Sequence, residues 1–318
     1  MRARIGITLG DPGGIGPEVL LKSLHKTSGR YVVFGSSKVL LHHSAKLQIP
    51  FDPSRVELID IDNVPEPYFG AVPQISGPAS IEYLNRAFES FQLGNISALV
   101  TGPIHKESWH ASGFAYPGQT EYCAEKTGQS RFCMIMVGRK FRIALLSTHL
   151  SLQAALHEVE KNKIADQIRL IHEEFVKLGY SHPRIACAAL NPHAGEKGAF
   201  GLEELDQIEP ALEQVRSEGI LVEGPVAPEV VFRVAATKGS WDVILAMYHD
   251  QAMIPLKLLE FENSANVTLG LPLIRTSPDH GTAFDIAGQG IANPGSMIFA
   301  MRLAADWTRR RKKFSATR

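Results

Sequence analysis

The alternation of short apolar runs with helical patterns constrains the fold of this chain more than any other feature. Each apolar run is followed by Gly, Pro, Asn or His, and helical patterns lie between several of the runs. Strands that alternate with helices predict βαβ units and a mostly parallel sheet, and continuous apolar runs are typical of strands covered on both faces. The expected strands are residues 5–9, 31–34, 98–101, 141–147, 184–190 and 241–248, and the expected helices are residues 17–25, 79–93, 152–178 and 202–218.

Two stretches between these elements are rich in Pro or Gly. Residues 60–78 contain four prolines and are expected to form a long loop. Residues 269–294 are too polar and too rich in glycine for an ordinary core element, and a loop of this kind can wrap a nucleotide with backbone groups. Within or near the second stretch, Arg275, Lys257 and Asn266 are candidates for holding an anion such as a phosphate. The alternative for each cation is a solvated surface charge.

Length and composition are those of a soluble globular protein. At roughly 100–200 residues per domain, 318 residues allow two domains or one large one. Hydrophobic residues make up 44% of the chain and charged residues 21%, which excludes wholesale disorder. The 33 basic and 33 acidic residues give no net charge, so a nucleic-acid partner is not expected. The basic run at 309–313 is interpreted as a solvated helix end.

The sequence also predicts a cytoplasmic location. The apolar runs are far shorter than the roughly 20 residues that span a bilayer, and no charged leader precedes a long apolar core. We therefore expect no membrane partner. The three cysteines include no CxxC pair, and a sparse, odd number of cysteines suits a reducing cytosol.

Three histidines follow the ends of three expected strands. His149, His193 and His249 lie one to three residues beyond the last residue of their runs. Because ligands of open parallel sheets bind at the carboxyl ends of strands, three imidazoles from separate strands can meet at one point and hold a divalent metal. The spacing matches no local metal motif, and the alternative is that each histidine makes hydrogen bonds within its own loop.

Two further features have more than one interpretation. Asp250 follows His249 directly and is a candidate metal ligand, partner of a ligand or proton acceptor, or else a helix N-cap. The glycine-rich opening at 10–18 fails the GxGxxG pattern at its last glycine, so a Rossmann fingerprint is not supported. Its glycines either let a ligand approach the backbone or form a tight turn from strand to helix.

Several segments together resemble one enzyme family. They read GDPGGIGPE at 10–18, TGPIHK at 101–106, LNPHAGE at 190–196 and YHDQ at 248–251, followed by the block 269–281. In this order they are similar to the 4-hydroxythreonine-4-phosphate dehydrogenase family of vitamin B6 biosynthesis, and the resemblance covers nearly the whole chain. Residues 280–294 also resemble the nucleotide loop of isopropylmalate and isocitrate dehydrogenases.

The resemblance implies a fold and an assembly. It implies two α/β/α domains with mostly parallel sheets that flank a central cleft. The first domain would combine residues 1–120 with 265–318, and the second would comprise residues 121–264 and carry the metal ligands and the dimer contact. The protein would be a homodimer whose active site takes residues from both subunits.

The resemblance also implies an activity. The family oxidises the C3 hydroxyl of 4-phosphooxy-L-threonine with NAD or NADP and one divalent metal (Zn, Mg or Co), and the product decarboxylates to 3-amino-2-oxopropyl phosphate. Asp250 and Lys106 are candidate catalytic residues. The implied ligand-binding positions are His149, His193 and His249 for the metal, Gln119, Thr120, Lys257, Asn266 and Arg275 for the phosphorylated substrate, and His280, Gly281, Asp285 and Asn293 for the nicotinamide cofactor.

One departure from the family pattern bears on the substrate. The family usually has His-Thr where this chain has Gln119-Thr120, and glutamine carries no charge near neutral pH. An alternative activity is therefore the dehydrogenation of 4-phosphorylated threonate or erythronate. Two other classes also remain, namely a metal-dependent lyase or hydrolase without nicotinamide and a non-catalytic protein that binds a phosphometabolite.

Overall fold

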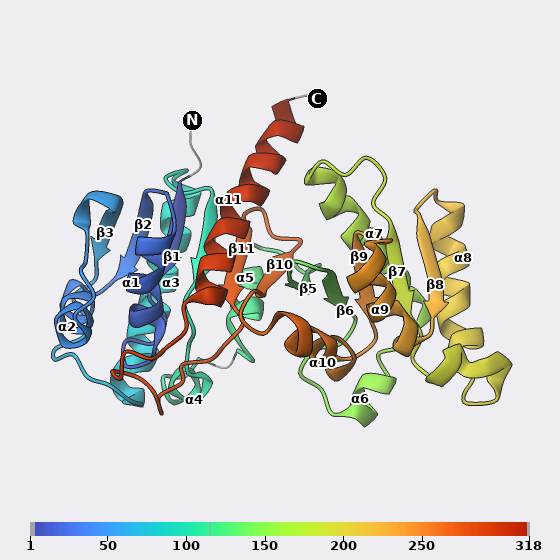
Figure 1. The fold of residues 1–318 in the computed structure, drawn as a ribbon, viewed down its shortest axis with the longest axis horizontal. Helices are drawn as coiled ribbons and strands as arrows, with labels where there is room; N and C mark the ends of the chain where they lie inside the picture. The colour runs from blue at the N-terminus through green and yellow to red at the C-terminus, as the bar shows by residue number, and fades with distance from the viewer. Residues whose placement is uncertain (1–3, 115, 317–318) are drawn as a thin grey trace. The chain divides into compact units, whose positions relative to one another are not determined.

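The computed structural model describes residues 4–114 and 116–316 and consists of two compact α/β units (Figure 1). The first unit comprises Met1–Ser130 and Leu271–Arg309, and the second comprises Arg131–Gly270 and Arg310–Arg318. A boundary at residue 120 would cut the helix α5 (Gln119–Lys126), which lies wholly in the first unit. Residues 265–270, expected in the first domain, lie in the second unit. The parts of the predicted domains at 1–3, 115 and 317–318 lie outside the described residues.

The first unit contains a parallel sheet with the strand order β3-β2-β1-β4-β11. Its first strand lies between the second and the fourth, so the connections run in opposite directions on its two sides. The carboxyl ends of β1 and β4 therefore form the switch point at which open α/β sheets bind ligands. The strands are β1 (Ile5–Thr8), β2 (Tyr31–Gly35), β3 (Val56–Asp60), β4 (Ala98–Thr101) and β11 (Ile274–Pro278).

Helices surround this sheet. The helix α3 packs on β1 and β2, and α4 packs on α3. The elements are α1 (Gly16–Lys26), α2 (Ser37–Leu47), the short η1 (Pro53–Arg55), α3 (Pro73–Gln92), α4 (Lys106–Ala111), α5 (Gln119–Lys126) and α11 (Gly295–Ala316), whose last turns belong to the second unit.

The second unit contains a mixed sheet with the order β10-β5-β6-β9-β7-β8. The strands β10, β5 and β6 pair antiparallel, and β6, β9, β7 and β8 pair parallel. The strands are β5 (Cys133–Val137), β6 (Arg142–Leu145), β7 (Ile185–Ala188), β8 (Val222–Val226), β9 (Val243–Ala246) and β10 (Ala265–Leu269). The helical elements are α6 (Leu152–Leu156), α7 (Lys161–Lys177), η2 (Pro192–Gly198), η3 (Glu204–Ile208), α8 (Glu209–Ser217), α9 (Pro228–Lys238) and α10 (His249–Glu260).

Apolar side chains from this sheet and two of its helices form one core. Ile143 of β6 and Ile244 of β9 are buried together with Leu256 of α10 and Val231 of α9. The helix α10 is therefore held by its apolar face, which fixes the position of its first residue, His249, at the end of β9. The packing of the core thus positions a candidate ligand.

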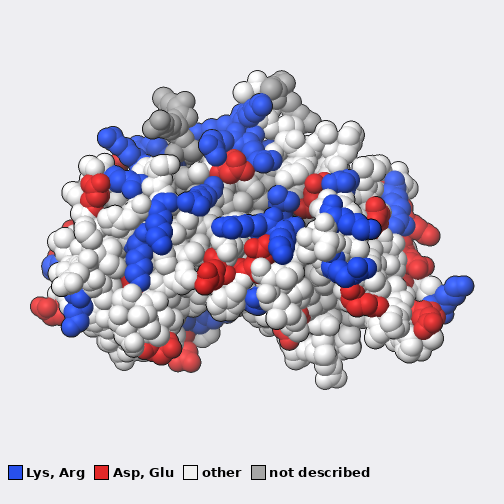
Figure 2. Space-filling view, in the orientation of Figure 1, with Lys and Arg blue, Asp and Glu red and all other residues white. Residues whose placement is uncertain are grey.

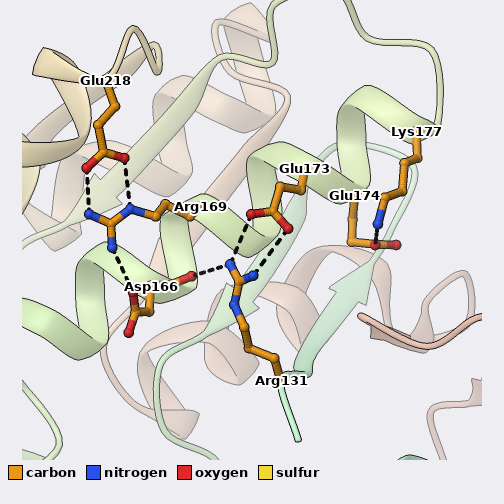
Figure 3. Close-up of polar contacts among 7 residues, drawn as sticks. All are labelled: Arg131, Asp166, Arg169, Glu173, Glu174, Lys177 and Glu218. Carbon is orange, nitrogen blue, oxygen red and sulfur yellow. Dashed lines mark hydrogen bonds and ion pairs between the residues drawn. The ribbon is translucent and has the colours of Figure 1, made fainter. Parts of the chain in front are cut away.

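Ion pairs attach α7 to its neighbours at the surface of the second unit (Figure 3). Arg169 donates to both carboxylate oxygens of Glu218, over 2.8 and 2.6 Å. Arg131 contacts both oxygens of Glu173 over 3.3 and 3.2 Å. Partly exposed pairs add little stability, but bidentate geometry restricts orientation, so these contacts fix where α7 lies against the sheet.

The predicted α/β class with mostly parallel strands is confirmed, and all of the expected strands form. The structure corrects the proline-rich loop, because α3 begins at Pro73, where the missing N–H of proline costs nothing at a helix start. It also corrects the block 269–294, because Ile274–Pro278 is a buried strand. The expected helix at 152–178 is divided into α6 and α7.

The surface shown in Figure 2 carries basic and acidic side chains next to one another over much of its area. Among residues 4–114 and 116–316, no helix has the length and apolar character that a membrane span needs. Cys123, Cys133 and Cys187 are free and buried.

Candidate active site

The glycine-rich opening lies at the switch point of the first sheet. Gly10 follows β1 with a φ of +74°, and a Cβ there would lie 2.2 Å from the carbonyl oxygen of Pro103, just beyond β4. The amide of Asp11 donates to that same carbonyl over 2.8 Å. The two strand ends are thus in backbone contact, which the tight-turn interpretation of these glycines explains. The approach of a ligand to this backbone stays a prediction.

Asp11 carries a buried carboxylate within this turn. Its Oδ1 accepts hydrogen bonds from the Gly13 amide over 2.9 Å and from the Ser76 hydroxyl over 3.0 Å. Burial raises the pKa of the Asp11 carboxyl, while these two donors lower it. The carboxylate therefore joins the opening to α3, a role that the sequence pattern did not reveal.

A cation and hydroxyl groups meet near the end of β4. Arg275 of β11 is buried, and it donates to the hydroxyls of Thr101 over 2.7 Å and of Thr120 over 3.2 Å. Burial lowers the pKa of its guanidinium, while the nearby Cys123 and Glu121 raise it. A guanidinium beside a hydroxyl provides the donors that a phosphate or carboxylate accepts.

Two more predicted residues lie beside this cation. The amide nitrogen of Gln119 donates to the Gly102 carbonyl over 2.9 Å. The Lys106 ammonium lies 3.9 Å from the point that a Cβ on Gly118 would occupy, next to Gln119 in the chain. The first unit thus brings together Lys106, Gln119, Thr120 and Arg275, and their contact with an anionic ligand stays a prediction.

The predicted nucleotide loop also lies against these segments. The ring of His105 contacts that of Phe284 at 5.1 Å between centroids. Within the loop, His280 Nδ1 lies 3.0 Å from the Gly281 carbonyl, and Gln289 donates to the backbone carbonyl of Asp285 over 2.6 Å. Asn293 accepts from the Gly295 amide over 2.8 Å at the start of α11. The loop is therefore a series of tight turns.

In the second unit, two of the three predicted imidazoles lie together. His149 follows β6 and His249 follows β9, and these strands are parallel neighbours. The ring centroids are 5.8 Å apart with an interplanar angle of 44°. Strand-end placement therefore brought this pair together as the sequence predicted.

His193 lies in an unusual backbone segment. Residues 193–197, within η2, all have positive φ angles between 43° and 74°, and only Gly195 among them is a glycine. Left-handed conformation costs roughly 1–2 kcal/mol for each non-glycine residue, so surrounding contacts must hold this turn. Such strain is found most often at functional sites.

The hydrogen bonds of two imidazoles suit metal ligation. His193 Nδ1 lies 2.7 Å from Glu229 Oε1, and His249 Nδ1 lies 2.6 Å from Asp250 Oδ1. A carboxylate on one ring nitrogen leaves the other available and fixes the direction of its lone pair, as around many zinc-bound histidines. Asp250 lies in the first turn of α10 and the N-cap is Tyr248, so the N-cap interpretation of Asp250 was wrong.

Within one chain these side chains do not complete a metal centre. The described residues contain no group of three or more His, Cys, Asp or Glu side chains that could hold a metal ion. His149 and His249 are paired, but His193 does not join them. The three-histidine ligand set therefore stays a prediction.

The remaining predicted substrate residues also lie in the second unit. The Lys257 ammonium of α10 lies 5.1 Å from the centre of the Phe261 ring. Asn266 of β10 donates to the sulfur of Met134 over 3.1 Å. Their predicted contact with substrate has no further support from these neighbours.

Sequence reasoning missed the carboxylates that support this site. Glu229 pairs with a histidine that lies 36 residues earlier in the chain. Glu204, unlike the exposed Glu229, is buried, and it accepts from the backbone amides of Leu190 and Asn191, over 2.8 Å each, at the start of the strained turn. No motif joins these positions, so only the packing of α9 and η3 reveals them.

The fold and these side chains define a class, namely an α/β protein with a buried guanidinium and hydroxyl groups at the strand ends of one unit and with imidazoles that carboxylates orient in the other. The family described as pyridoxal phosphate biosynthetic protein PdxA matches residues 27–304. The chain belongs to this family.

Curated relatives and a solved structure agree with that assignment. A 4-hydroxythreonine-4-phosphate dehydrogenase from Aquifex aeolicus is 42% identical over 96% of this chain and 98% of its own. A D-threonate 4-phosphate dehydrogenase from Cupriavidus necator is 39% identical over 96% and 98%. The crystal structure of 4-hydroxythreonine-4-phosphate dehydrogenase from Klebsiella pneumoniae superposes with a TM-score of 0.87, at 37% identity, over 96% of this chain and 99% of that one.

Proposed function

We propose that this protein is a metal-dependent dehydrogenase that oxidises 4-phosphooxy-L-threonine at C3 with NAD or NADP. The product then decarboxylates to 3-amino-2-oxopropyl phosphate, in the biosynthesis of pyridoxal 5'-phosphate. Family membership and the names of relatives over almost the whole chain support this activity. The observation that carries it is the buried Arg275, which the Thr101 and Thr120 hydroxyls orient at the switch point.

The residues of the first unit would bind and orient the substrate. Arg275 and Thr120 supply donors to an anionic group, and Lys106 adds a second cation beside them. Fixing the anionic end of a small substrate lowers the entropic cost of reaching the reactive geometry. Lys257 and Asn266 are proposed to contact the substrate from the second unit, and Asp250 and Lys106 are the candidates for proton transfer.

His149, His193 and His249 would hold a divalent metal such as Zn, Co or Mg. When bound, a divalent cation polarises an alcohol or ketone oxygen and thereby favours both oxidation and decarboxylation. The chain itself contributes three imidazoles, two of them oriented by Asp250 and Glu229. In this arrangement Asp250 orients His249 through the hydrogen bond to its Nδ1, and a role of Asp250 as the catalytic base stays a prediction.

The nicotinamide cofactor would bind to the loop that contains His280, Gly281, Asp285 and Asn293. The loop offers turn backbone and small side chains close to β4 and to the Phe284–His105 contact. Backbone amides and glycines are suited to the close approach of a dinucleotide. This loop distinguishes the proposed dehydrogenase from a metal-dependent lyase, which has no use for it.

Exposed apolar side chains support a homodimer with a shared active site. On α10, which begins at His249, Ile254 and Leu258 are 60% and 79% exposed. Phe261 at its C-cap is 70% exposed, and the spacing of the three residues places them on one face. The segments after His149 and His193 are also apolar at the surface. An apolar surface of this kind is typical of an interface, and burying it against a second copy would surround the imidazoles. The other large apolar residues exposed after those two histidines are Leu150, Leu152, Leu156, Phe200, Leu202 and Leu205.

The three cysteines support the cytoplasmic location expected from the sequence. All three are free and buried, and burial raises the pKa of Cys123 to about 11 and of Cys133 and Cys187 to about 12. They are therefore protonated, unreactive thiols near neutral pH, as expected of core residues in a reducing compartment.

D-threonate 4-phosphate is the second candidate substrate. The relative from Cupriavidus necator is named for that activity and is almost as similar as the first. Gln119 is also neutral. One N–H of its amide is bound to the Gly102 carbonyl, which leaves its second N–H as a donor and its carbonyl oxygen as an acceptor. Such an acceptor suits a hydroxyl as well as an ammonium group on the substrate.

A substrate panel tests the proposed function. Purified protein is assayed for NADH or NADPH formation with 4-phosphorylated threonine, D-threonate and erythronate, each with both nicotinamides and with Zn, Co or Mg. We expect turnover of 4-phosphooxy-L-threonine to have the highest kcat/KM. A clear preference for threonate would assign the second candidate function, and failure to reduce either nicotinamide with all substrates would refute the dehydrogenase.

Removal of the metal tests the role of the histidines. A chelator should abolish activity while the protein stays folded, and added divalent metal should restore it. His193→Ala should lose bound metal with little effect on folding, because that side chain is 66% exposed. Full activity in excess chelator, or wild-type metal content in His193→Ala, would contradict the ligand assignment.

A further inference from the structure

The helix α1 carries a buried ion pair whose contacts lead to the predicted nucleotide loop. Glu18 is fully buried, and its Oε1 accepts from the Ala292 amide over 2.9 Å and from the Lys22 ammonium over 2.7 Å. The same ammonium donates to the backbone carbonyls of Gly290 and Ala292, over 2.8 Å each. Residues about 270 positions apart in the chain are thus joined by one pair.

The other end of the loop is tied to the segment that precedes α1. The amide of Ile15 donates to the Thr282 carbonyl over 2.9 Å. A Cβ on Gly14 would lie 2.9 Å from the same oxygen, so the two backbones are in close contact. The turns at 283–289, which include Asp285, are therefore held between two anchors on one helix start.

Lys22 has no donor left for a ligand. An ammonium group has three N–H donors, and Glu18, Gly290 and Ala292 take all three. The charge of Lys22 is also balanced by Glu18 at 2.7 Å. This lysine therefore acts on the conformation of the loop and does not bind a cofactor phosphate.

We infer that the Glu18–Lys22 pair is a positioning device that fixes the 290–292 end of the nucleotide loop before the nicotinamide dinucleotide binds. The inference rests on the proposed function for the role of the loop. A loop that is already ordered loses less conformational entropy on binding, so the pair should raise affinity for the nicotinamide and leave affinity for the phosphorylated substrate unchanged.

The test replaces the pair without leaving a buried charge. The double variant Glu18→Gln/Lys22→Met keeps the approximate volume of both side chains, and Glu18→Gln alone, which keeps the lysine contacts to the carbonyls, serves if the double variant fails to fold. Lys26→Met is the matched control, because Lys26 lies one turn later on the same helix and is exposed. Hydrogen exchange without ligand, calorimetric NAD affinity and substrate affinity are measured on the full-length protein.

We expect faster amide exchange confined to residues 283–292 and about tenfold weaker NAD binding, which is the effect of ordering roughly one more residue. Substrate affinity and kcat at saturating NAD should stay close to those of the control. Glu18→Gln should show the same changes to a smaller extent. Wild-type exchange and NAD affinity in the variants, or equal losses of NAD and substrate affinity, would overturn the inference. If the native protein itself bound no NAD, the proposed function would fail, while the exchange measurement would still decide whether the pair holds the loop.

Discussion

A single buried histidine illustrates how position changes the chemistry of a residue. His43 lies in α2, and its side chain is fully buried against the ring of Phe69, at 4.7 Å between centroids. Burial lowers the pKa of His43 from 6.5 to about 4. The buried face of α2 therefore includes this histidine together with Val39 and Leu40.

This shift predicts how stability depends on pH. Below pH 6.5 the unfolded chain binds a proton at His43, whereas the folded protein does so only near pH 4. The free energy of unfolding therefore has its full value above pH 6.5 and decreases as the pH falls toward 4. The full decrease in the free energy of unfolding is roughly 3 kcal/mol. In urea unfolding between pH 4 and pH 8, His43→Phe should lose less free energy of unfolding over that window than the native protein. If the free energies of unfolding of the native protein and of His43→Phe changed equally with pH, His43 would not titrate in this way.

The glycine at the end of β1 gives a second prediction at this scale. Gly10→Ala would place a methyl group 2.2 Å from the Pro103 carbonyl oxygen in a backbone with positive φ. We expect a loss of roughly 3 kcal/mol or more in the free energy of unfolding, because both backbones must shift. Gly94→Ala is the control, since Gly94 has a similar φ of +72° with open space around it. Equal losses in the two variants would show that φ alone, and not the β1–β4 contact, decides the cost.

Residue types and strand ends predicted part of the site and could not predict the rest. His149 and His249 follow strands that turned out to be neighbours, so chemistry and position agreed. Glu229 and the Glu18–Lys22 pair reach partners across distant segments, and each alone looks like an ordinary surface charge. These contacts depend on how α1 and α9 pack against their neighbours, because no periodic pattern in the sequence shows which charged side chains will pair.

At the scale of elements, the left-handed turn after β7 depends on one buried carboxylate. Glu204 accepts from the amides of Leu190 and Asn191 and from the Asn191 side chain, over 2.8 Å each. A Cβ on Gly195 would lie 2.6 Å from Glu204 Oε2, so the turn closes around the Glu204 side chain. Glu204 of η3 therefore supports the strained backbone that presents His193.

Removing that carboxylate should release the turn. Glu204→Leu leaves buried amides without an acceptor, and we expect a loss of about 3 kcal/mol in the free energy of unfolding together with weaker metal binding. Glu213→Leu, at an exposed position of α8, is the control and should change neither. Chemical denaturation and cobalt titration give the two measurements. A destabilised Glu204→Leu that binds cobalt as well as the native protein would show that the turn does not position a ligand.

The same scale shows why some elements could be predicted and others could not. Runs such as β4 are continuous and apolar, and they appeared at the expected residues. The strand β11 contains Arg275 and two hydroxyl residues, all buried, so its composition is that of a loop although its neighbours make it a core strand. The prolines of α3 hid its first turns in the same way, since Pro78 lies inside the helix. In both cases tertiary packing overrode a correct local preference.

At the scale of the whole molecule, the proposed homodimer would account both for the lack of a three-ligand metal group among the described residues and for the exposed apolar face of α10. We predict that Leu258→Asp, at a position 79% exposed, shifts the protein to monomers in sedimentation analysis and sharply weakens metal binding. NAD affinity should persist, because the nucleotide loop lies in the first unit. Leu93→Asp is the matched control, since Leu93 is 77% exposed at the end of α3, and it should remain a dimer with full metal content.

Each outcome of this experiment separates the two parts of the explanation. A monomeric Leu258→Asp that binds metal with native affinity would mean that one chain completes the ligand set, against the lack of such a group among the described residues. If Leu258→Asp stayed dimeric, the dimer interface would not include the exposed face of α10. Loss of metal together with loss of the dimer, while NAD still binds, is the result expected if the metal takes ligands from two subunits, since Leu258 is remote in the sequence from His149 and His193 and lies two turns after His249 on α10.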